Sequence, residues 1–334
     1  MTLDVQQIPH RVFKGLLLAC LISFCAYGMK ITMGVPLMLS ALIMGMVVNP
    51  FINSRSDYKA GIDFSASTLL KVGIVLLGSR ISFEMISALG WETLTSIIAV
   101  VALSVILGFL AGKLFKKTTQ LSLLTATAVS ICGASAALAI ACILPASKSK
   151  DQDLGFTIMA VTVFSSIGMI AYPLIAHILN FSESMSGVLM GLSLHNVAQA
   201  VASGFLVSET SGETATIVKM ARISLLVPYL ICMNLILNRK FENSSNCNRP
   251  AIMPSFLLGF IAIVILNSFH LIPPYFQQYM VAGSKTLLCI SVAAIGLQTS
   301  IGDVKKMGFQ AFNLVFLQSL IILMLSILVV ISFS

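Results

Sequence analysis

The chain has 334 residues, of which 57% are hydrophobic and 10% are charged, and its mean hydropathy is +0.99. This composition is typical of a polytopic helical membrane protein and excludes a sizeable soluble domain, because too few charged residues remain to cover one. A net charge of +8 would suggest nucleic-acid binding in a soluble protein. In a membrane protein we assign it to loops and expect no nucleic-acid partner.

Apolar runs near the length of about 20 residues that crosses a bilayer follow one another along the chain. We therefore expect an all-α membrane protein of about eleven transmembrane helices. The short connections predict a single polytopic membrane domain over residues 1–334. The predicted spans are 12–29, 34–51, 64–80, 91–113, 120–145, 154–179, 185–207, 213–237, 252–269, 280–298 and 309–332.

Basic residues are distributed unevenly over the predicted loops. With the amino terminus in the cytoplasm, the opposite side carries only four basic residues: Lys30, Arg80, Lys148 and Lys150. The cytoplasmic side carries twelve: Arg11, Lys14, Arg55, Lys59, Lys113, Lys116, Lys117, Arg239, Lys240, Arg249, Lys305 and Lys306. Cytoplasmic loops are enriched in Lys and Arg, so we expect a multi-pass protein with a cytoplasmic amino terminus.

The charges within the apolar runs are cationic. All twelve acidic residues fall in, or at the ends of, predicted loops, whereas Lys71 lies near the middle of 64–80. Lys219 and Arg222 lie near the start of 213–237. Intramembrane charge usually lines a cavity or pathway, and Arg grips oxyanions in a bidentate way, so this asymmetry points to an anion. The alternatives are a snorkelling Lys71 and an interfacial pair that contacts lipid headgroups.

A duplication is indicated because residues 35–90 align with 253–308 at a constant offset of 218. The second span then maps to the ninth, and this odd shift places the two copies in opposite orientations. Inverted repeats of this kind recur in secondary transporters. The carboxyl-terminal copy leaves the fifth and sixth spans without partners. The matched pairs include Pro36 with Pro254, Asn49 with Asn267, Gly78 with Gly296, Ser82 with Ser300 and Gly90 with Gly308.

Small and polar residues interrupt the span 120–145. Gly133 allows the chain to leave helical geometry, and Ser130 and Ser135 lie on either side of it. We expect a broken helix whose free N–H groups face an anion near the midplane. Ordinary packing of helices through small residues is the alternative.

The span 185–207 contains a polar face. His195 and Gln199 are four residues apart, and Asn196, Gln199 and Ser203 continue the same helical face. A His with two amides and a hydroxyl forms a donor-rich wall that also titrates near neutral pH. A structural His is the alternative, and proton coupling through His195 is a further hypothesis.

Metal, cofactor and disulfide chemistry are not indicated. The seven cysteines form no CxxC motif and no cluster with histidines. We therefore expect no cofactor and no metal site. His195 with Ser193 or Ser130 could be drawn as a base and nucleophile, but no acidic residue accompanies them, so we expect no enzyme activity.

Three segments together resemble the YeiH family of bacterial inner-membrane proteins, whose members are commonly labelled sulfate exporters. The segments are 69–82 (LLKVGIVLLGSRIS), 131–136 (ICGASA) and 191–199 (GLSLHNVAQ). The resemblance implies a bacterial inner-membrane carrier related to the bile acid symporter and cation/proton antiporter folds, with a core that moves against a scaffold. The family more typically has an acidic residue after the His, where this chain has Asn196.

These observations predict a secondary active transporter that exports a small anion by alternating access. Sulfate, a sulfonate or a related organic anion is the substrate that the resemblance implies. An anion channel and an intramembrane enzyme are the alternatives. A coupling ion, proton or sodium, and a homodimer are left open. The predicted substrate-binding residues are Lys71, Ser130, Gly133, Ser135, His195, Asn196, Gln199, Lys219 and Arg222.

Overall fold

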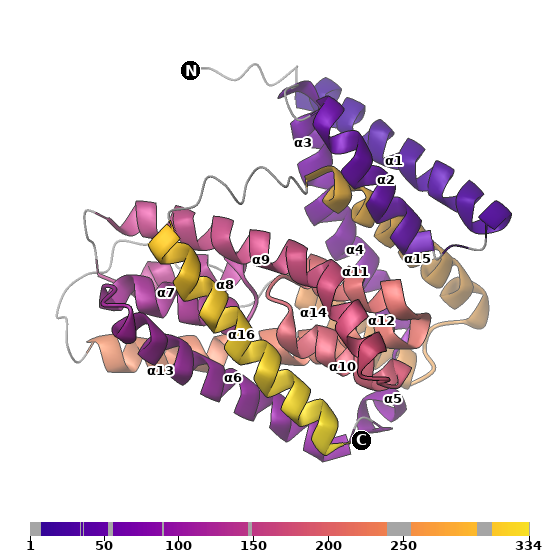
Figure 1. The fold of residues 1–334 in the computed structure, drawn as a ribbon. Coiled ribbons are helices and arrows are strands. Elements are labelled where there is room, and N and C mark those ends of the chain that lie inside the picture. Colours follow the sequence, from indigo (N-terminus) through magenta and orange to yellow (C-terminus); the bar gives the residue numbers. More distant parts are fainter. Residues whose placement is uncertain are drawn as a thin grey trace. The chain divides into compact units, whose positions relative to one another are not determined.

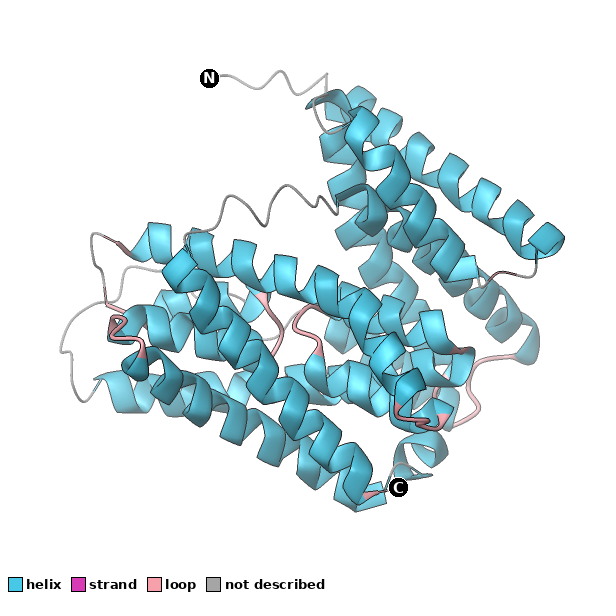
Figure 2. Ribbon diagram, viewed as in Figure 1, coloured by secondary structure: helices cyan, strands magenta, loops and turns pink. Residues whose placement is uncertain are grey.

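Helices joined by short turns make up the part of the chain that the structure describes. The computed structural model describes residues 8–33, 35, 37–52, 56–88, 90–145, 149–238, 255–298 and 309–333, and no strand occurs among them (Figure 2). The predicted all-α class is therefore confirmed. The helices form two compact units, residues 1–86 with 256–302 and residues 87–255 with 303–334. The expectation of a single membrane domain stays a prediction.

The first unit combines the amino-terminal helices with two later ones (Figure 1). A π-helical turn (Ser65–Leu69) joins α3 to α4, and a 3₁₀ turn (Gly78–Arg80) follows α4. The chain divides between the units within α5 (Phe83–Ala88). The other helices are α1 (Ile8–Met33), α2 (Leu37–Ile52), α3 (Ser56–Phe64), α4 (Leu70–Leu77), α14 (Ser255–Ser268) and α15 (Pro274–Gln298).

Two asparagines join the segments that the repeat alignment relates. Asn49 of α2 donates its side-chain amide to the Leu297 carbonyl of α15, with Nδ2 and O 2.6 Å apart. Its aligned partner, Asn267 of α14, donates to the Ile81 carbonyl just after α4 at 3.0 Å. Each copy therefore provides an amide to the end of the following helix of the other copy.

Two glycines repeat this reciprocal pattern. A Cβ added at Gly296 of α15 would overlap the Leu42 carbonyl oxygen of α2, and one added at Gly78 would lie 3.0 Å from the Phe260 carbonyl oxygen of α14. Leu42 and Phe260 are themselves separated by the offset of 218. The approach at Gly296 requires a residue without a side chain, and the approach at Gly78 is tight enough to favour one.

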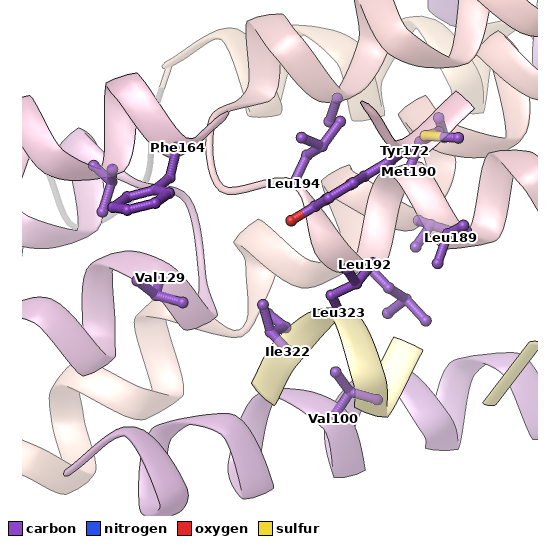
Figure 3. Packing of buried hydrophobic residues seen from close by; sticks show 14 of the residues in the cluster. Val100, Val129, Phe164, Tyr172, Leu189, Met190, Leu192, Leu194, Ile322 and Leu323 are labelled. Atoms are coloured by element: carbon purple, nitrogen blue, oxygen red, sulfur yellow. The ribbon is translucent and has the colours of Figure 1, made fainter. Parts of the chain in front are cut away.

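The second unit packs nine described helices around a buried apolar cluster. Figure 3 shows part of this cluster, to which α6, α7, α9, α10 and α16 all contribute side chains. The helices are α6 (Gly90–Leu114), α7 (Thr119–Ser130), α8 (Ala134–Ile143), α9 (Lys150–Ile178), α10 (Glu183–Ser193), α11 (Val197–Val207), α12 (Glu209–Ser224), α13 (Leu226–Asn238) and α16 (Phe309–Ser332).

Helices α7 and α8 form a hairpin, which we call the first hairpin, with its tip at residues 131–133. The side-chain amide of Gln120, at the start of α7, donates to the carbonyl of Pro145, just beyond α8. The two ends of the segment therefore meet. An arm of 12 residues rises about 18 Å, well short of the roughly 30 Å hydrocarbon core.

Helices α10 and α11 form the second hairpin, with its tip at residues 194–196. Gly187 of α10 and Gly204 of α11 approach the same atom, because an added Cβ would lie 2.6 Å and 2.9 Å, respectively, from the Ser211 carbonyl oxygen. Ser203 of α11 also contacts the Met190 sulfur of α10 at 3.1 Å. Both arms therefore return to the start of α12.

A long helix follows each hairpin. Helix α9 has 29 residues, about 44 Å, and the Asn196 N–H at the second tip reaches the Ser165 hydroxyl near its middle. Because α9 runs past both tips, the two hairpins start from opposite ends of it. The order of hairpin and long helix then recurs in the second hairpin, α12 and α13.

The predicted count of about eleven spans is not confirmed. Seven helical stretches among the described residues are long and apolar enough to cross a membrane: Val12–Thr32, Asp57–Arg80, Gly90–Leu114, Gln152–Ile178, Glu209–Ile236, Pro274–Gln298 and Phe312–Ser332. The predicted spans 120–145 and 185–207 are instead the two hairpins. Their arms are short because the chain turns at residues 131–133 and 194–196.

Two carboxylates of the described residues lie beyond the first turn of a helix. Asp63 is in the last turn of α3, where its Oδ1 accepts a hydrogen bond from Gln298 Nε2 at 2.7 Å. Helix α12 begins after the capping Ser208 hydroxyl, so Glu213 lies one turn inside it. The Glu213 side chain is buried. The expectation that all acidic residues lie in or beside loops is therefore wrong at these positions.

The hairpins predict an unusual pattern of surface labelling. In a cysteine-free background, Thr119→Cys and Gln152→Cys, at the two ends of the first hairpin, should react with a membrane-impermeant maleimide from the same side of the membrane. Glu183→Cys and Thr210→Cys, at the ends of the second hairpin, should both react from the opposite side. If 120–145 and 185–207 were each a single crossing helix, the two members of each pair would instead react from opposite sides.

Candidate functional site at the hairpin tips

The tips of the two hairpins touch each other. Gly133, at the first tip, has φ +68° and ψ −125°, a conformation open to Gly and costly for other residues. A Cβ added there would overlap Oδ1 of Asn196, at the second tip. Figure 2 draws the turns between the helices of the second unit in pink. The predicted interruption at Gly133 is thus present, and its partner is the segment that carries His195.

Arg222 of α12 joins the two tips through backbone carbonyls. On the first hairpin its guanidinium donates to Ser130 O at 2.6 Å and to Val129 O. On the second it donates to Leu192 O at 2.7 Å and Leu194 O at 2.9 Å. These carbonyls end the first arm of each hairpin and have no partner within their own helices. Arg222 therefore satisfies both interruptions at once.

Lys219, one turn earlier on α12, has the same function. Its ammonium donates to Ile131 O at 3.2 Å and to Leu194 O at 2.6 Å. Both cationic side chains are fully buried, and each donates to carbonyls of both tips. The sequence predicts Lys219 and Arg222 as substrate-binding residues, and this stays a prediction. In the structure both side chains donate to carbonyls at the helix ends.

The balance of charge at the tips is positive. Each helix carboxyl terminus carries about half a negative charge, so the ends of α7 and α10 together offset about one elementary charge. With both side chains protonated, Lys219 and Arg222 contribute two charges. Their hydrogen bonds go to carbonyls, without a carboxylate. Roughly one positive charge therefore remains uncompensated.

The amino termini of the second arms add to this positive potential and are accessible. Gly133, before α8, has no side chain that could cap the first turn, and the Asn196 side chain, before α11, makes no hydrogen bond to the first turn. Ser135 in that turn of α8 is exposed, and Asn196 and Ala198 of the second hairpin are partly exposed. Backbone N–H groups at two helix starts are thus available to a ligand.

Two polar atoms buried at the tips have no hydrogen-bond partner. They are the Ser130 hydroxyl oxygen and Oε1 of Gln199, on side chains that are 0% and 6% exposed. An unmade hydrogen bond of a buried polar group costs about 1–3 kcal/mol. Gln199 Nε2 contacts the Ser166 hydroxyl of α9 at 3.4 Å. A bound polar ligand or water would complete both groups.

His195 lies inside the unit rather than at the accessible face. Its Nδ1 lies 3.3 Å from Val129 O, which Arg222 also contacts, and its Nε2 lies 2.9 Å from the Ser319 hydroxyl of α16. A carbonyl only accepts, so Nδ1 carries a proton in this geometry. His195 therefore links the first tip, the second tip and α16.

Eight of the nine predicted site residues meet at these tips. Ser130, Gly133 and Ser135 come from the first hairpin, His195, Asn196 and Gln199 from the second, and Lys219 and Arg222 from α12. Lys71 is the exception. It lies in α4 of the other unit, two residues after the π-helical turn, with an exposed side chain.

Sequence reasoning missed the helices that support the tips. Ser165 and Ser166 of α9 hold Asn196 and Gln199, and Ser319 of α16 holds His195. Adjacent hydroxyls in the middle of the run 154–179 were a detectable signal. Within the described residues, no group of three or more His, Cys, Asp or Glu side chains is placed to hold a metal ion.

Comparison with known proteins places this chain among bacterial membrane proteins. It is 37% identical over 314 residues to the UPF0324 membrane protein TauZ of Paracoccus pantotrophus, which covers 92% of this chain and 93% of that protein. A UPF0324 membrane protein of Chlorobaculum tepidum is 31% identical, over 94% of this chain and 88% of its own. No solved structure matches.

The family model described as "Conserved hypothetical protein 698" matches residues 14–315. This match spans both hairpins, α9 and α12, and ends within α16, before Ser319. The resemblance to YeiH-type proteins that three sequence segments suggested is therefore confirmed. The chain belongs to the UPF0324 family of membrane proteins.

Proposed function

We propose that the protein is a secondary active transporter of a small oxyanion, bound at the hairpin tips. Sulfate, a sulfonate or a related organic anion fits the donor groups there, because N–H and hydroxyl groups bind oxygen atoms. The family consists of membrane proteins; the substrate and the transport mechanism are the proposal.

One observation carries the proposal. The tips combine two buried basic side chains that donate to carbonyls rather than to a carboxylate, two accessible helix amino termini and two unpartnered buried groups, Ser130 Oγ and Gln199 Oε1. Helix starts of this kind bind anions in many proteins. The carboxyl-terminal ends, which would repel an anion, are covered by Lys219 and Arg222. The open side of the tips is thus the side that attracts negative charge.

Alternating access is supported by the repeated architecture. Asn49 with Asn267 and Gly78 with Gly296 make reciprocal contacts, as expected of the inverted duplication of 35–90 with 253–308. The two hairpins, each followed by a long helix, provide the partner segments that the alignment lacked. A carrier uses such symmetry to open to either side in turn. A channel has no need of it, and an enzyme would need a carboxylate to orient His195.

A cytoplasmic amino terminus is supported by the hairpins. If the first hairpin returns to the side on which it started, Lys148 and Lys150 move to the side of the amino terminus. Only Lys30 and Arg80 then remain opposite, which sharpens the asymmetry expected of cytoplasmic loops. The proposed topology has nine crossings and two re-entrant hairpins, in a bacterial inner membrane.

Proton coupling through His195 is part of the proposal. With Nδ1–H donated to Val129 O, a neutral imidazole accepts a hydrogen bond from Ser319 at Nε2. Protonation reverses this bond, and the Ser319 hydroxyl is then left to donate to Val315 O, 2.8 Å away. One proton at His195 would therefore change how the second tip is held to α16.

The first test is thermal unfolding of the purified protein with sulfate, thiosulfate, sulfonates, dicarboxylates and sodium chloride. An oxyanion should raise the midpoint, by about 2.7 kcal/mol of stability at 100 times the dissociation constant. Ser130→Ala should leave the unliganded midpoint unchanged, because its hydroxyl has no partner, and weaken the anion effect about tenfold.

Ser193→Ala is the matched control for Ser130→Ala. Ser193 ends α10 as Ser130 ends α7, but its hydroxyl donates to Leu189 O at 2.6 Å. This variant should lower the unliganded midpoint and keep the anion affinity. Lys71→Ala, in the other unit, tests whether Lys71 supplies countercharge during transport. Stabilisation by sodium alone, whatever the anion, would overturn the anion proposal.

Asn196→Asp should raise the stability of the unliganded protein and weaken its binding of an oxyanion. The carboxylate is close in size to the amide and sits before the first turn of α11, where a negative charge stabilises a helix by about 0.3–1 kcal/mol. We expect a higher unliganded midpoint and an oxyanion affinity at least roughly tenfold lower, because the carboxylate occupies the same N–H groups.

Asn180→Asp adds the same charge at an exposed position after α9 and serves as the control for Asn196→Asp. It should change neither quantity by a comparable amount. An Asn196→Asp protein that binds the oxyanion as tightly as the parent would show that the helix starts are not the site.

His195→Gln should flatten the pH dependence of transport. The amide keeps one hydrogen bond at this position but does not titrate, whereas a His ordinarily titrates between about pH 5 and 8. Uptake of the anion identified by thermal unfolding, measured in proteoliposomes over this range, checks the expectation. If the variant keeps the pH profile of the parent, His195 is not the coupling group.

A further inference from the structure

Tyr172 of α9 has a largely buried side chain whose hydroxyl group is not used by the described residues. The side chain is 8% exposed, and no hydrogen bond to its oxygen occurs within the described residues. A half-buried tyrosine of the same unit differs, because the Tyr229 hydroxyl of α13 lies 2.7 Å from the Thr127 hydroxyl. A phenol buried in an apolar cluster normally finds a partner, so its absence requires a reason.

The ring of Tyr172 packs against the second tip. A Cβ added at Gly168, one turn earlier on α9, would lie 3.0 Å from the tyrosine Cζ and 2.9 Å from Cδ2 of Leu194. Leu194 is the tip residue whose carbonyl receives both Lys219 and Arg222. The absence of a side chain at Gly168 is thus what allows the ring and the tip to meet.

The hydroxyl is directed away from α9 and towards the first hairpin. In Figure 3 the ring lies between Leu194 and Leu192, and its oxygen points to the side where Val129 lies. Val129 immediately precedes Ser130, whose hydroxyl also has no partner. The phenol therefore extends from the second tip towards the end of the first arm.

The position of Tyr172 on α9 agrees with this direction. Ser165, seven residues earlier and on the same helical face, receives the Asn196 N–H at 3.1 Å. This face of α9 therefore contacts the second tip through Ser165 and carries the Tyr172 hydroxyl two turns further along. The Tyr172 hydroxyl therefore joins Ser130 Oγ and Gln199 Oε1, which are buried without a hydrogen-bond partner, among the polar groups near the tips that could bind a ligand.

We propose that the Tyr172 hydroxyl is a specificity-determining ligand of the transported oxyanion, to which it donates a hydrogen bond. The inference rests on the proposed function and adds a residue that sequence reasoning did not select. A neutral donor from α9 adds directional selection of an oxygen atom to the helix starts. A hydrogen bond to a charged acceptor is also stronger than one to a neutral acceptor, so an anion is the ligand that gains most.

Tyr172→Phe tests the proposal by titration of the unfolding midpoint with the oxyanion that stabilises the parent protein most. Removal of the hydroxyl breaks no bond within the protein, so the unliganded midpoint should be unchanged. The apparent affinity for the oxyanion should fall about tenfold. Tyr229→Phe is the matched control. It should lower the unliganded midpoint, because Thr127 loses its partner, and leave the affinity unchanged.

Each outcome decides between the two proposals. If the parent is stabilised by an oxyanion and Tyr172→Phe responds equally, the role of Tyr172 is overturned while the transported class stands. If Tyr172→Phe lowers the unliganded midpoint as Tyr229→Phe does, with unchanged affinity, the hydroxyl has a structural role and the inference also fails. A parent protein that no oxyanion stabilises overturns both.

Discussion

An interrupted helix in a membrane leaves backbone carbonyls without partners, and the second unit depends on how this is resolved. Each unsatisfied group in hydrocarbon costs several kcal/mol, yet both hairpins end their first arm at the same buried place. Arg222 and Lys219, one turn apart on α12, donate to the carbonyls of both tips. A single helix therefore fastens two segments that are about 60 residues apart in the chain. The cost of burying two cations is offset by the carbonyl groups that surround them.

The same arrangement separates two kinds of helix end. The carboxyl-terminal ends of α7 and α10 face inward, where protein cations cover them, and the amino-terminal ends of α8 and α11 lack side-chain caps. The chain thus supplies its own partner for the negative ends and leaves the positive ends for something else. Ser130, Gln199 and Tyr172 add unused polar groups around them. This division agrees with the proposal of an anionic ligand.

The sequence predicted the helical class and the interruption at Gly133, because each depends on local chemistry. The expected helical face through His195, Asn196 and Gln199 is wrong in its geometry, because His195 and Asn196 lie in the turn between α10 and α11. The sequence did not predict the hairpins. A run of about 25 apolar residues has the same composition whether it crosses a membrane or folds back, and only contacts such as Gln120 with Pro145 distinguish the two. The roles of Lys219 and Arg222 were equally hidden, since their partners are backbone carbonyls and every sequence supplies those. Lys71 looked equivalent to them by position alone, but it belongs to the other unit.

The contact between Gly133 and Asn196 also restricts how this protein can change over evolutionary time. The backbone of Gly133 is closed to other residues by its φ of +68° and by the oxygen that rests on it. A larger group at either tip would push the two hairpins apart, so shape at these positions is inherited as a pair. Charge is under no such restriction, because an amide and a carboxylate have nearly the same outline. Relatives can therefore diverge in the electrical character of the tip while its geometry stays fixed.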